Sequence, residues 1–134
     1  MTTGSTDLAQ MLATLEATAR PDTYVYTIVE PDHPVLVVAQ VTVQEERGLT
    51  AVIRKQDAQT HNLDYEFECA WLTLTVHSSL EAVGLTAAFS TALGNAGISC
   101  NVIAGFYHDH LLVPVADKDR ALAVLAELRN SSTV

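Results

Sequence analysis

The stretch from Leu72 to Pro114, LTLTVHSSLEAVGLTAAFSTALGNAGISCNVIAGFYHDHLLVP, decides the fold. Its first residues alternate between apolar and polar side chains, which predicts a strand that ends near Val76. The apolar period then becomes that of a helix, with Gly97 placed as a left-handed helix end and Leu85, Ala88, Phe89, Ala92, Leu93 and Ala96 on the apolar side. Two further strands are predicted at Asn101 to Ala104 and at Leu111 to Val115, so the stretch indicates a split βαβ sheet.

The residues before this stretch predict more strands and short helices. The spacing of four apolar residues predicts an amphipathic helix that ends before Pro21, with Leu8, Met11, Leu12 and Leu15 on its apolar side. A strand from Tyr24 to Val29 is interrupted at Pro31 to Pro34, because proline fixes φ and lacks an N–H. The remaining predictions are a resumed strand from Val35 to Gln44, a turn at residues 45–48, a strand from Leu49 to Arg54, a short helix from Gln56 to Leu63 and a long strand from Tyr65 to Val76. After the deciding stretch, Asp117 is placed to cap a final helix with Ala121, Leu122, Leu125 and Leu128 facing inward, followed by a frayed tail at Asn130 to Val134.

Three runs in the deciding stretch, TVHSSLEAVGLTAAFSTAL, AGISCNVIAG and YHDHLLVPV, resemble the carboxy-terminal half of a small family of uncharacterised bacterial proteins built from ACT-type domains. A weaker resemblance extends over the amino-terminal half through DLAQML, PDTYVYTIV, GLTAVI and NLDYEFECAWLTL. ACT domains are ferredoxin-like modules that commonly bind amino acids. The resemblance therefore implies an α+β fold of two tandem ferredoxin-like βαββαβ halves, with antiparallel sheets and helices packed on one face. We expect an N-terminal ACT-like half at residues 1–66 and a closely fused C-terminal half, βαββα, at residues 67–134.

Composition excludes several classes of partner. The chain has 134 residues and a net charge of −9, which repels phosphate backbones and anionic lipid, so neither nucleic acid nor a membrane is expected as a partner. The amino terminus lacks the pattern of a secretion signal, and Cys69 and Cys100 form no CxxC pair. We therefore expect a cytoplasmic protein with reduced thiols. No glycine-rich phosphate loop is visible, and no cofactor is predicted.

The turn from His77 to Gly84 is the main candidate for a ligand site. It joins a strand end to a helix start, where free backbone N–H groups favour a carboxylate. The resemblance to ACT domains implies that such a turn holds the ligand at an interface between modules, and it assigns this role here to Ser78, Ser79, Leu80, Val83 and Gly84. The alternative is purely structural, because Ser78 and Glu81 have the spacing of a capping box.

A second group of candidates lies near the last strand. Phe106 and Tyr107 can wall a ligand pocket beside a glycine-containing turn, and core packing is the competing interpretation for Phe106. Asp109 can bind a ligand ammonium group, and Asn101 completes the predicted ligand-binding set. His108 and His110 at i and i+2 can share a metal ion, but a metal site needs a third and usually a fourth convergent ligand, and the same residues form an ordinary polar turn. We therefore predict no metal site. Trp71 is predicted to lie in the core.

The sequence favours a non-enzymatic regulatory protein that binds a small molecule, an amino acid above all. Ser78, His77 and Asp109 have the residue types of a nucleophilic triad, but adjacent residues at one strand end point to opposite faces. Two alternatives remain open, namely a protein–protein interaction module without a ligand and a metal-dependent enzyme that uses His108 and His110. A homodimer is also predicted, since 49% hydrophobic residues leave apolar surface for a second copy.

Overall fold

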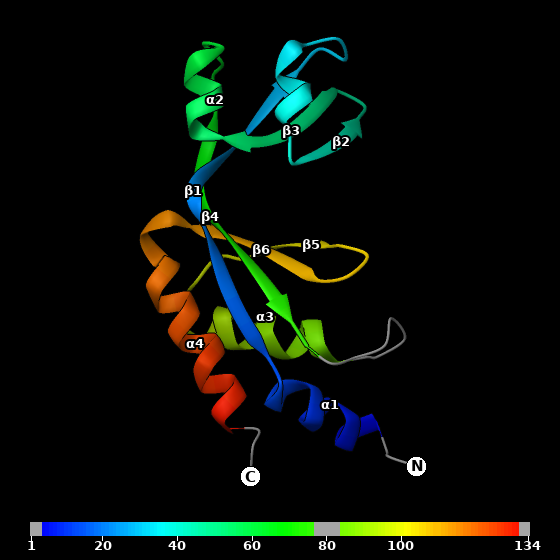
Figure 1. Cartoon of the computed structure of the whole chain (residues 1–134), viewed down its shortest axis with the longest axis vertical. Helices are drawn as coiled ribbons and strands as arrows, with labels where there is room; N and C mark the ends of the chain where they lie inside the picture. Colours follow the sequence, from blue (N-terminus) through cyan, green and yellow to red (C-terminus); the bar gives the residue numbers. More distant parts are fainter. Residues whose placement is uncertain (1–3, 77–83, 132–134) are drawn as a thin grey trace.

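The computed structural model describes residues 4–76 and 84–131, and these residues form one sheet with helices packed against it (Figure 1). The predicted α+β class is confirmed. Among the described residues, no helix is long and apolar enough to cross a bilayer. In chain order the elements are α1 (Gly4–Ala13), β1 (Glu16–Val29), the 3-10 helix η1 (Pro34–Val38), β2 (Val41–Glu45), β3 (Gly48–Arg54), α2 (Lys55–Thr60), β4 (Glu66–Thr75), α3 (Leu85–Asn95), β5 (Asn101–Ala104), β6 (Asp109–Pro114), the 3-10 helix η2 (Val115–Asp117) and α4 (Lys118–Ser131).

The sheet has six antiparallel strands in the order β2-β3-β1-β4-β6-β5. This order contains the same four-strand arrangement twice, because β1 and β4 belong to both copies. We call β1-η1-β2-β3-α2-β4 the N-terminal half, a βαββαβ unit in which η1 takes the place of the first helix. The C-terminal half is β4-α3-β5-β6-α4, and residues 16–19 of β1 serve as its fourth strand. The predicted tandem ferredoxin-like fold is confirmed, whereas the boundary at residue 66 stays a prediction.

Two long strands hold the halves together. Near its start β1 pairs with the end of β4, with Glu16 opposite Thr75 and Ala19 opposite Leu72. Farther along, the residues from Tyr24 to Val29 pair with β3. A register shift between Ala19 and Thr23 separates these two parts of β1. Pro21 falls inside this irregularity, where the N–H that proline lacks is not needed for the ladder.

Helices cover one face of the sheet in each half. In the C-terminal half, α1, α3 and α4 bury a large apolar cluster that includes Leu15, Leu72, Phe89, Leu111 and Leu125. In the N-terminal half, η1 and α2 close a smaller cluster formed by Val25, Val29, Val35, Ala51, Ile53 and Ala58. Burial of these side chains supplies the main driving force for packing the helices on the sheet.

The opposite face of the sheet, which we call the open face, carries a third cluster. Tyr24, Val52, Cys69, Trp71 and Leu112 are buried there, so the prediction that Trp71 lies in the core is confirmed. The Tyr24 and Trp71 rings lie 5.3 Å apart between their centroids. Because Val52 comes from β3 and Leu112 from β6, this cluster joins the two halves on the side that the helices leave uncovered.

Two predicted elements differ from the structure. The resumed strand from Val35 to Gln44 is wrong, because Pro34–Val38 forms η1 and β2 starts only at Val41. Pro34 stands at the first turn of this helix, a position where a missing N–H does no harm, so the proline starts a helix rather than merely breaking a strand. The N-terminal helix ends before Pro21 as predicted, but it ends at Ala13, so Leu15 lies beyond the helix and β1 already begins at Glu16.

Candidate functional site

The repeated strand order places two connections in equivalent positions. In the N-terminal half, residues 30–33 lead from the end of β1 to η1, and in the C-terminal half residues 76–84 lead from the end of β4 to α3. Each connection follows the first strand of its half, where the chain leaves the sheet to enter a helix. Sequence reasoning predicted a site only at the second connection.

Most of that predicted site lies outside the described residues. The structure does not describe five of the predicted ligand residues, namely His77, Ser78, Ser79, Leu80 and Val83. Their assignment as ligand residues therefore stays a prediction. Gly84 is described and forms the N-cap of α3, which begins at Leu85. Ser78 and Glu81 lie outside the described residues, so their interpretation as a capping box stays a prediction.

The backbone at Gly84 has two structural reasons to be glycine. Its φ is +92°, which side chains with a Cβ rarely adopt. An added Cβ would also lie 3.1 Å from Cδ2 of Leu8 in α1. These constraints account for the glycine without a ligand, so a substitution here would change stability as well as any binding.

The other predicted ligand residues are spread over the β5–β6 hairpin. Asp109 pairs in register with Leu74 near the end of β4, beside the second connection. Asn101 is exposed and pairs with Leu112, which places it on the open face. Phe106 and Tyr107 lie at the hairpin tip with 75% and 84% of their surface exposed, so the core interpretation of Phe106 is wrong. Their rings contact each other edge to face, 4.9 Å apart between centroids.

The two histidines proposed as weak metal ligands have separate environments. His108 lies in the exposed turn before β6. His110 is half-buried on β6, and its Nδ1 accepts hydrogen bonds from the Trp71 indole at 3.2 Å and the Thr73 hydroxyl at 3.0 Å. Across residues 4–76 and 84–131, no group of three His, Cys, Asp or Glu side chains is placed to hold a metal ion.

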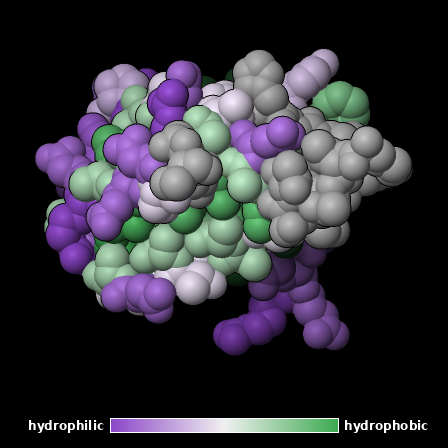
Figure 2. Space-filling view, turned by 90° about the horizontal axis from the view of Figure 1, so that it is seen from below, coloured by the Kyte–Doolittle hydropathy of each residue, from purple (hydrophilic) through white to green (hydrophobic). Residues whose placement is uncertain are grey.

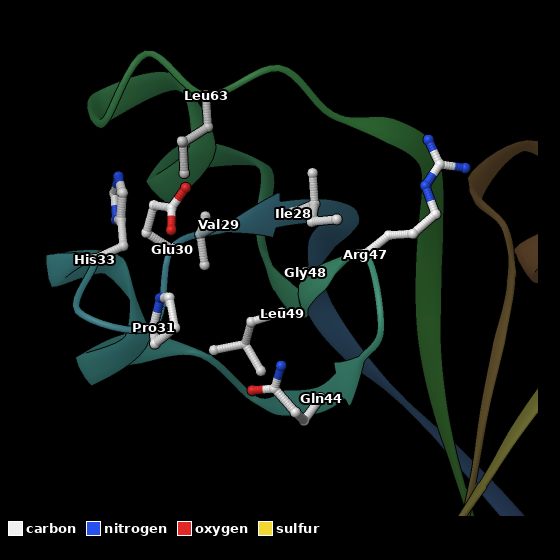
Figure 3. Close-up of a pocket in the computed structure, with 10 residues that line it drawn as sticks. All are labelled: Ile28, Val29, Glu30, Pro31, His33, Gln44, Arg47, Gly48, Leu49 and Leu63. Carbon is white, nitrogen blue, oxygen red and sulfur yellow. The ribbon is translucent and has the colours of Figure 1, made fainter.

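A cavity of about 410 Å³ opens at the first connection, which sequence reasoning did not identify as a site. Figure 3 shows Glu30, His33 and Leu63 on one side of it, Pro31, Leu49 and Gln44 on the other, and Val29 between them. The walls from Val29, Pro31, Leu49 and Leu63 are apolar, whereas Glu30, His33 and Gln44 bring polar groups to the rim. A concave apolar site with a few convergent polar groups is the usual form of a small-molecule site.

His33 is held in a defined orientation at this cavity. Its Nδ1 accepts a hydrogen bond from the Val35 backbone N–H at 3.0 Å, so the side chain caps η1. In the neutral ring the proton is then on Nε2, which is free to donate to a ligand oxygen. The ring also packs against His61 at 5.6 Å between centroids.

The charged groups at the rim differ in their direction. The Glu30 carboxylate lies among the lining side chains and can accept hydrogen bonds from an ammonium group, whereas the Arg47 side chain extends away from the cavity (Figure 3). Gly48, between Arg47 and Leu49, leaves room for Ile28, since an added Cβ would come within 2.6 Å of its Cδ1. The arrangement can therefore take a molecule with an ammonium group, a hydrogen-bond acceptor and a modest apolar body.

One signal in the sequence could have revealed this cavity. The second proline in PDHP, Pro34, is followed by five apolar residues, a pattern that fits a first helical turn, so the segment matches the strand-to-helix connection predicted at residues 76–84. The burial of Leu49 and Leu63 against the same cluster could not be seen from the sequence, because it depends on pairing between distant strands.

Similarity to known proteins agrees with the repeated architecture. Residues 3–70 match one family described as an ACT domain, and residues 66–127 match a second family with the same description. None of the curated proteins is significantly similar to the chain. A protein of unknown function from Vibrio cholerae, described as a possible transport protein, is 39% identical, with a TM-score of 0.86 over 95% of this chain and 99% of its own.

More distant structures share the fold alone. A protein from Agobacterium tumefaciens has a TM-score of 0.67 at 16% identity, over 86% of this chain and 89% of its own. The ligand-free regulatory subunit of aspartate kinase from Thermus thermophilus has a TM-score of 0.60 at 12% identity, over 84% of this chain and 95% of its own. The two family matches together span nearly the whole chain, and the chain belongs to the ACT domain family as a tandem of two ACT domains.

Proposed function

We propose that this protein is a non-enzymatic regulatory protein that binds an amino acid at the end of a first strand. The observation that carries the proposal is the cavity of about 410 Å³ at the first connection, with Glu30 and His33 at its rim. ACT domains are commonly regulatory modules that bind amino acids, which supports the ligand class. The turn from His77 to Gly84 is the equivalent position in the C-terminal half, and we propose it as a second ligand position.

The chemistry of the rim supports an amino acid over a simple anion. Glu30 provides a negative charge for the ammonium group, and His33 offers an Nε2–H donor for the carboxylate. Leu49 and Leu63 provide apolar contact for a side chain. A dianionic ligand would place its charge against Glu30 in a protein of net charge −9, so it fits less well.

A thermal-shift screen with the twenty common amino acids tests the proposal. A ligand at about 100 times its dissociation constant adds roughly 2.7 kcal/mol to stability, which corresponds to a rise of several degrees in Tm. We expect Glu30→Gln to reduce this rise strongly. Asp32→Asn is the matched control, because it removes the same charge from an exposed neighbour that does not line the cavity. An unchanged shift in Glu30→Gln would move the site to the second connection, where Ser79→Ala then becomes the test, and no shift with any amino acid would reject the proposal.

We also propose that the protein acts as a homodimer. Figure 2 shows hydrophobic residues gathered at the end of the molecule where α1 and the carboxy-terminal end of α4 lie. The two outermost strands, β2 and β5, contain no proline or lysine, features that commonly protect a sheet edge from pairing. Light scattering at micromolar concentration tests this proposal, and a monodisperse monomer would contradict it.

A cytoplasmic location is part of the same proposal. Cys69 and Cys100 are both unpaired thiols, which is typical of proteins in a reducing compartment. Cell fractionation of the source organism tests this, and recovery of the protein outside the cytoplasm would contradict it.

A further inference from the structure

A continuous chain of side-chain contacts crosses the open face from one ACT half to the other. It begins at Gln40, between η1 and β2, whose Oε1 accepts a hydrogen bond from Nη1 of Arg20 at 2.8 Å. The guanidinium of Arg20 lies 4.0 Å from the centre of the Trp71 ring, a close cation–π contact. The Trp71 indole then donates to Nδ1 of His110 at 3.2 Å, in the C-terminal half.

The positions of these residues in the sheet show that the contacts link the two halves. Arg20 lies in the irregular part of β1 between its two pairing regions, where the strand passes from one half to the other. The Gln40 backbone N–H donates to the Val52 carbonyl at 2.9 Å, which fixes the start of β2 on β3. A change at His110 can therefore reach the N-terminal half through two intervening side chains.

The hydrogen bond from Trp71 to His110 requires an unprotonated Nδ1. This atom faces both the Trp71 indole N–H and the Thr73 hydroxyl at 3.0 Å. An indole nitrogen can only donate, so a proton on Nδ1 would set two donors against each other and break that bond. The other ring nitrogen, Nε2, lies next to Gly105, where an added Cβ would be 3.0 Å away. The hairpin turn therefore restricts the ring from moving aside.

The groups around His110 oppose its protonation overall. Partial burial has the largest effect and lowers the pKa of His110. The positive charges of Arg20 from β1 and His108 from the hairpin turn lower it further. Asp109, its neighbour on β6, acts in the opposite direction. Trp71 and Thr73 from β4 and Ile103 from β5 are uncharged neighbours. Protonation is therefore expected at a pH below about 6.5, the ordinary value for histidine.

We propose that His110 is a proton-sensitive latch between the two ACT domains. The neutral imidazole holds the Trp71 indole in place under Arg20, and Arg20 in turn holds Gln40 at the start of β2. Protonation breaks the bond from Trp71, loosens the Arg20 stacking and releases the contact with Gln40. The latch does not require a bound ligand, so its test is independent of the proposed amino-acid site.

Solution NMR on the full chain tests the latch, because the protein contains a single tryptophan. The probes are the Trp71 indole N–H and the Gln40 side-chain amide, followed from about pH 8 to about pH 5. We expect both resonances to shift with one common midpoint below about pH 6.5. His110→Asn keeps an acceptor near the Nδ1 position but cannot take a proton, so both transitions should disappear. In Arg20→Gln the midpoint of the Trp71 transition should move upward, because a positive charge that lowers the pKa of His110 is removed.

The matched control is His108→Asn, an exposed neighbour of the same type. It should keep the common transition and move its midpoint slightly upward. Three results would overturn the proposal: no Trp71 transition in the wild-type protein, a transition of unchanged size in His110→Asn, or a Gln40 amide that does not follow Trp71. If His110→Asn lowers stability, the wild-type titration still tests the proposal, because Trp71 and Gln40 must show a common transition.

Discussion

At the scale of single residues, a few positions are determined by backbone geometry or burial rather than by chemistry with a ligand. Gly84 occupies the left-handed region at the start of α3, against Leu8. Cys69 is buried on the open face, where its Sγ donates to the Tyr24 carbonyl at 3.2 Å. Each of these environments makes a prediction that can be tested without knowing the ligand.

Gly84→Ala should destabilise the protein by about 1 kcal/mol or more, since alanine at a positive φ is strained and its Cβ would press on Leu8. Gly94→Ala is the matched control, because Gly94 lies within α3 and an added Cβ there meets nothing within 4 Å. It should stabilise the protein by roughly 0.5–1 kcal/mol. Urea denaturation measures the free energy of unfolding of both variants. Equal changes of the same sign would contradict the claim that Gly84 is required by its positive φ and by Leu8.

The pH dependence of stability should carry the signature of Cys69. Burial raises the pKa of its thiol to about 12. The folded state therefore resists ionisation, whereas the unfolded chain ionises near the ordinary cysteine value of about 8.5–9. The stabilising contribution is complete below that value and is lost as the pH rises toward 12. Cys69→Ala should flatten this alkaline loss in chemical denaturation curves, and an unchanged slope would argue against a buried neutral thiol.

At the scale of elements, the short helix η1 positions the first connection. It is only five residues long. His33 caps its start and Pro34 occupies its first turn, and both favour a helix directly after the chain leaves β1. Its residue Val35 is fully buried, so η1 closes the apolar cluster of the N-terminal half. A change at the cap should therefore affect the cavity and the local stability together.

His33→Ala removes the acceptor for the Val35 N–H and should cost about 1 kcal/mol of stability. His33→Asn should restore most of that loss, because asparagine is a strong N-cap residue. Thermal denaturation separates the two variants. If alanine and asparagine behave alike, His33 does not act as a cap.

At the scale of the whole molecule, the two ACT domains share their strands and cannot be cut apart cleanly. α1 and the start of β1 come first in the chain, yet they pack with the C-terminal half. Leu15 is 2% exposed in the same cluster as Phe89 and Leu125. Leu8, Leu12 and Leu15 therefore complete the core that α3 and α4 form with the sheet.

Leu15→Ala should destabilise the protein by about 2–5 kcal/mol, through lost burial and the cavity left behind. The matched control is Leu128→Ala in α4, a half-buried residue at the edge of the same cluster, which should cost clearly less. Guanidinium denaturation followed by circular dichroism measures both. A small effect at Leu15 would show that the amino-terminal segment is not part of this core.

Local patterns predicted much of the fold, because the split βαβ order, the apolar side of α3 and Gly97 at its end are encoded in neighbouring residues. The resemblance to ACT domains added the tandem arrangement. The pairing of residues 16–19 with 72–75 was not predictable, since it depends on contacts between segments far apart in the chain. For the same reason, the cavity lined by Val29, Leu49 and Leu63 and the contact of Arg20 with Trp71 became visible only in the folded chain.

We propose above all that an amino acid binds at a connection where the first strand of an ACT domain leaves the sheet. A titration of the isotope-labelled protein with the most stabilising amino acid, followed by amide NMR, tests it most directly. We expect saturable shifts centred on residues 29–33 and 48–49, on residues 76–84, or on both connections. Saturable shifts confined to other parts of the molecule, or no shifts with any of the twenty amino acids, would contradict it.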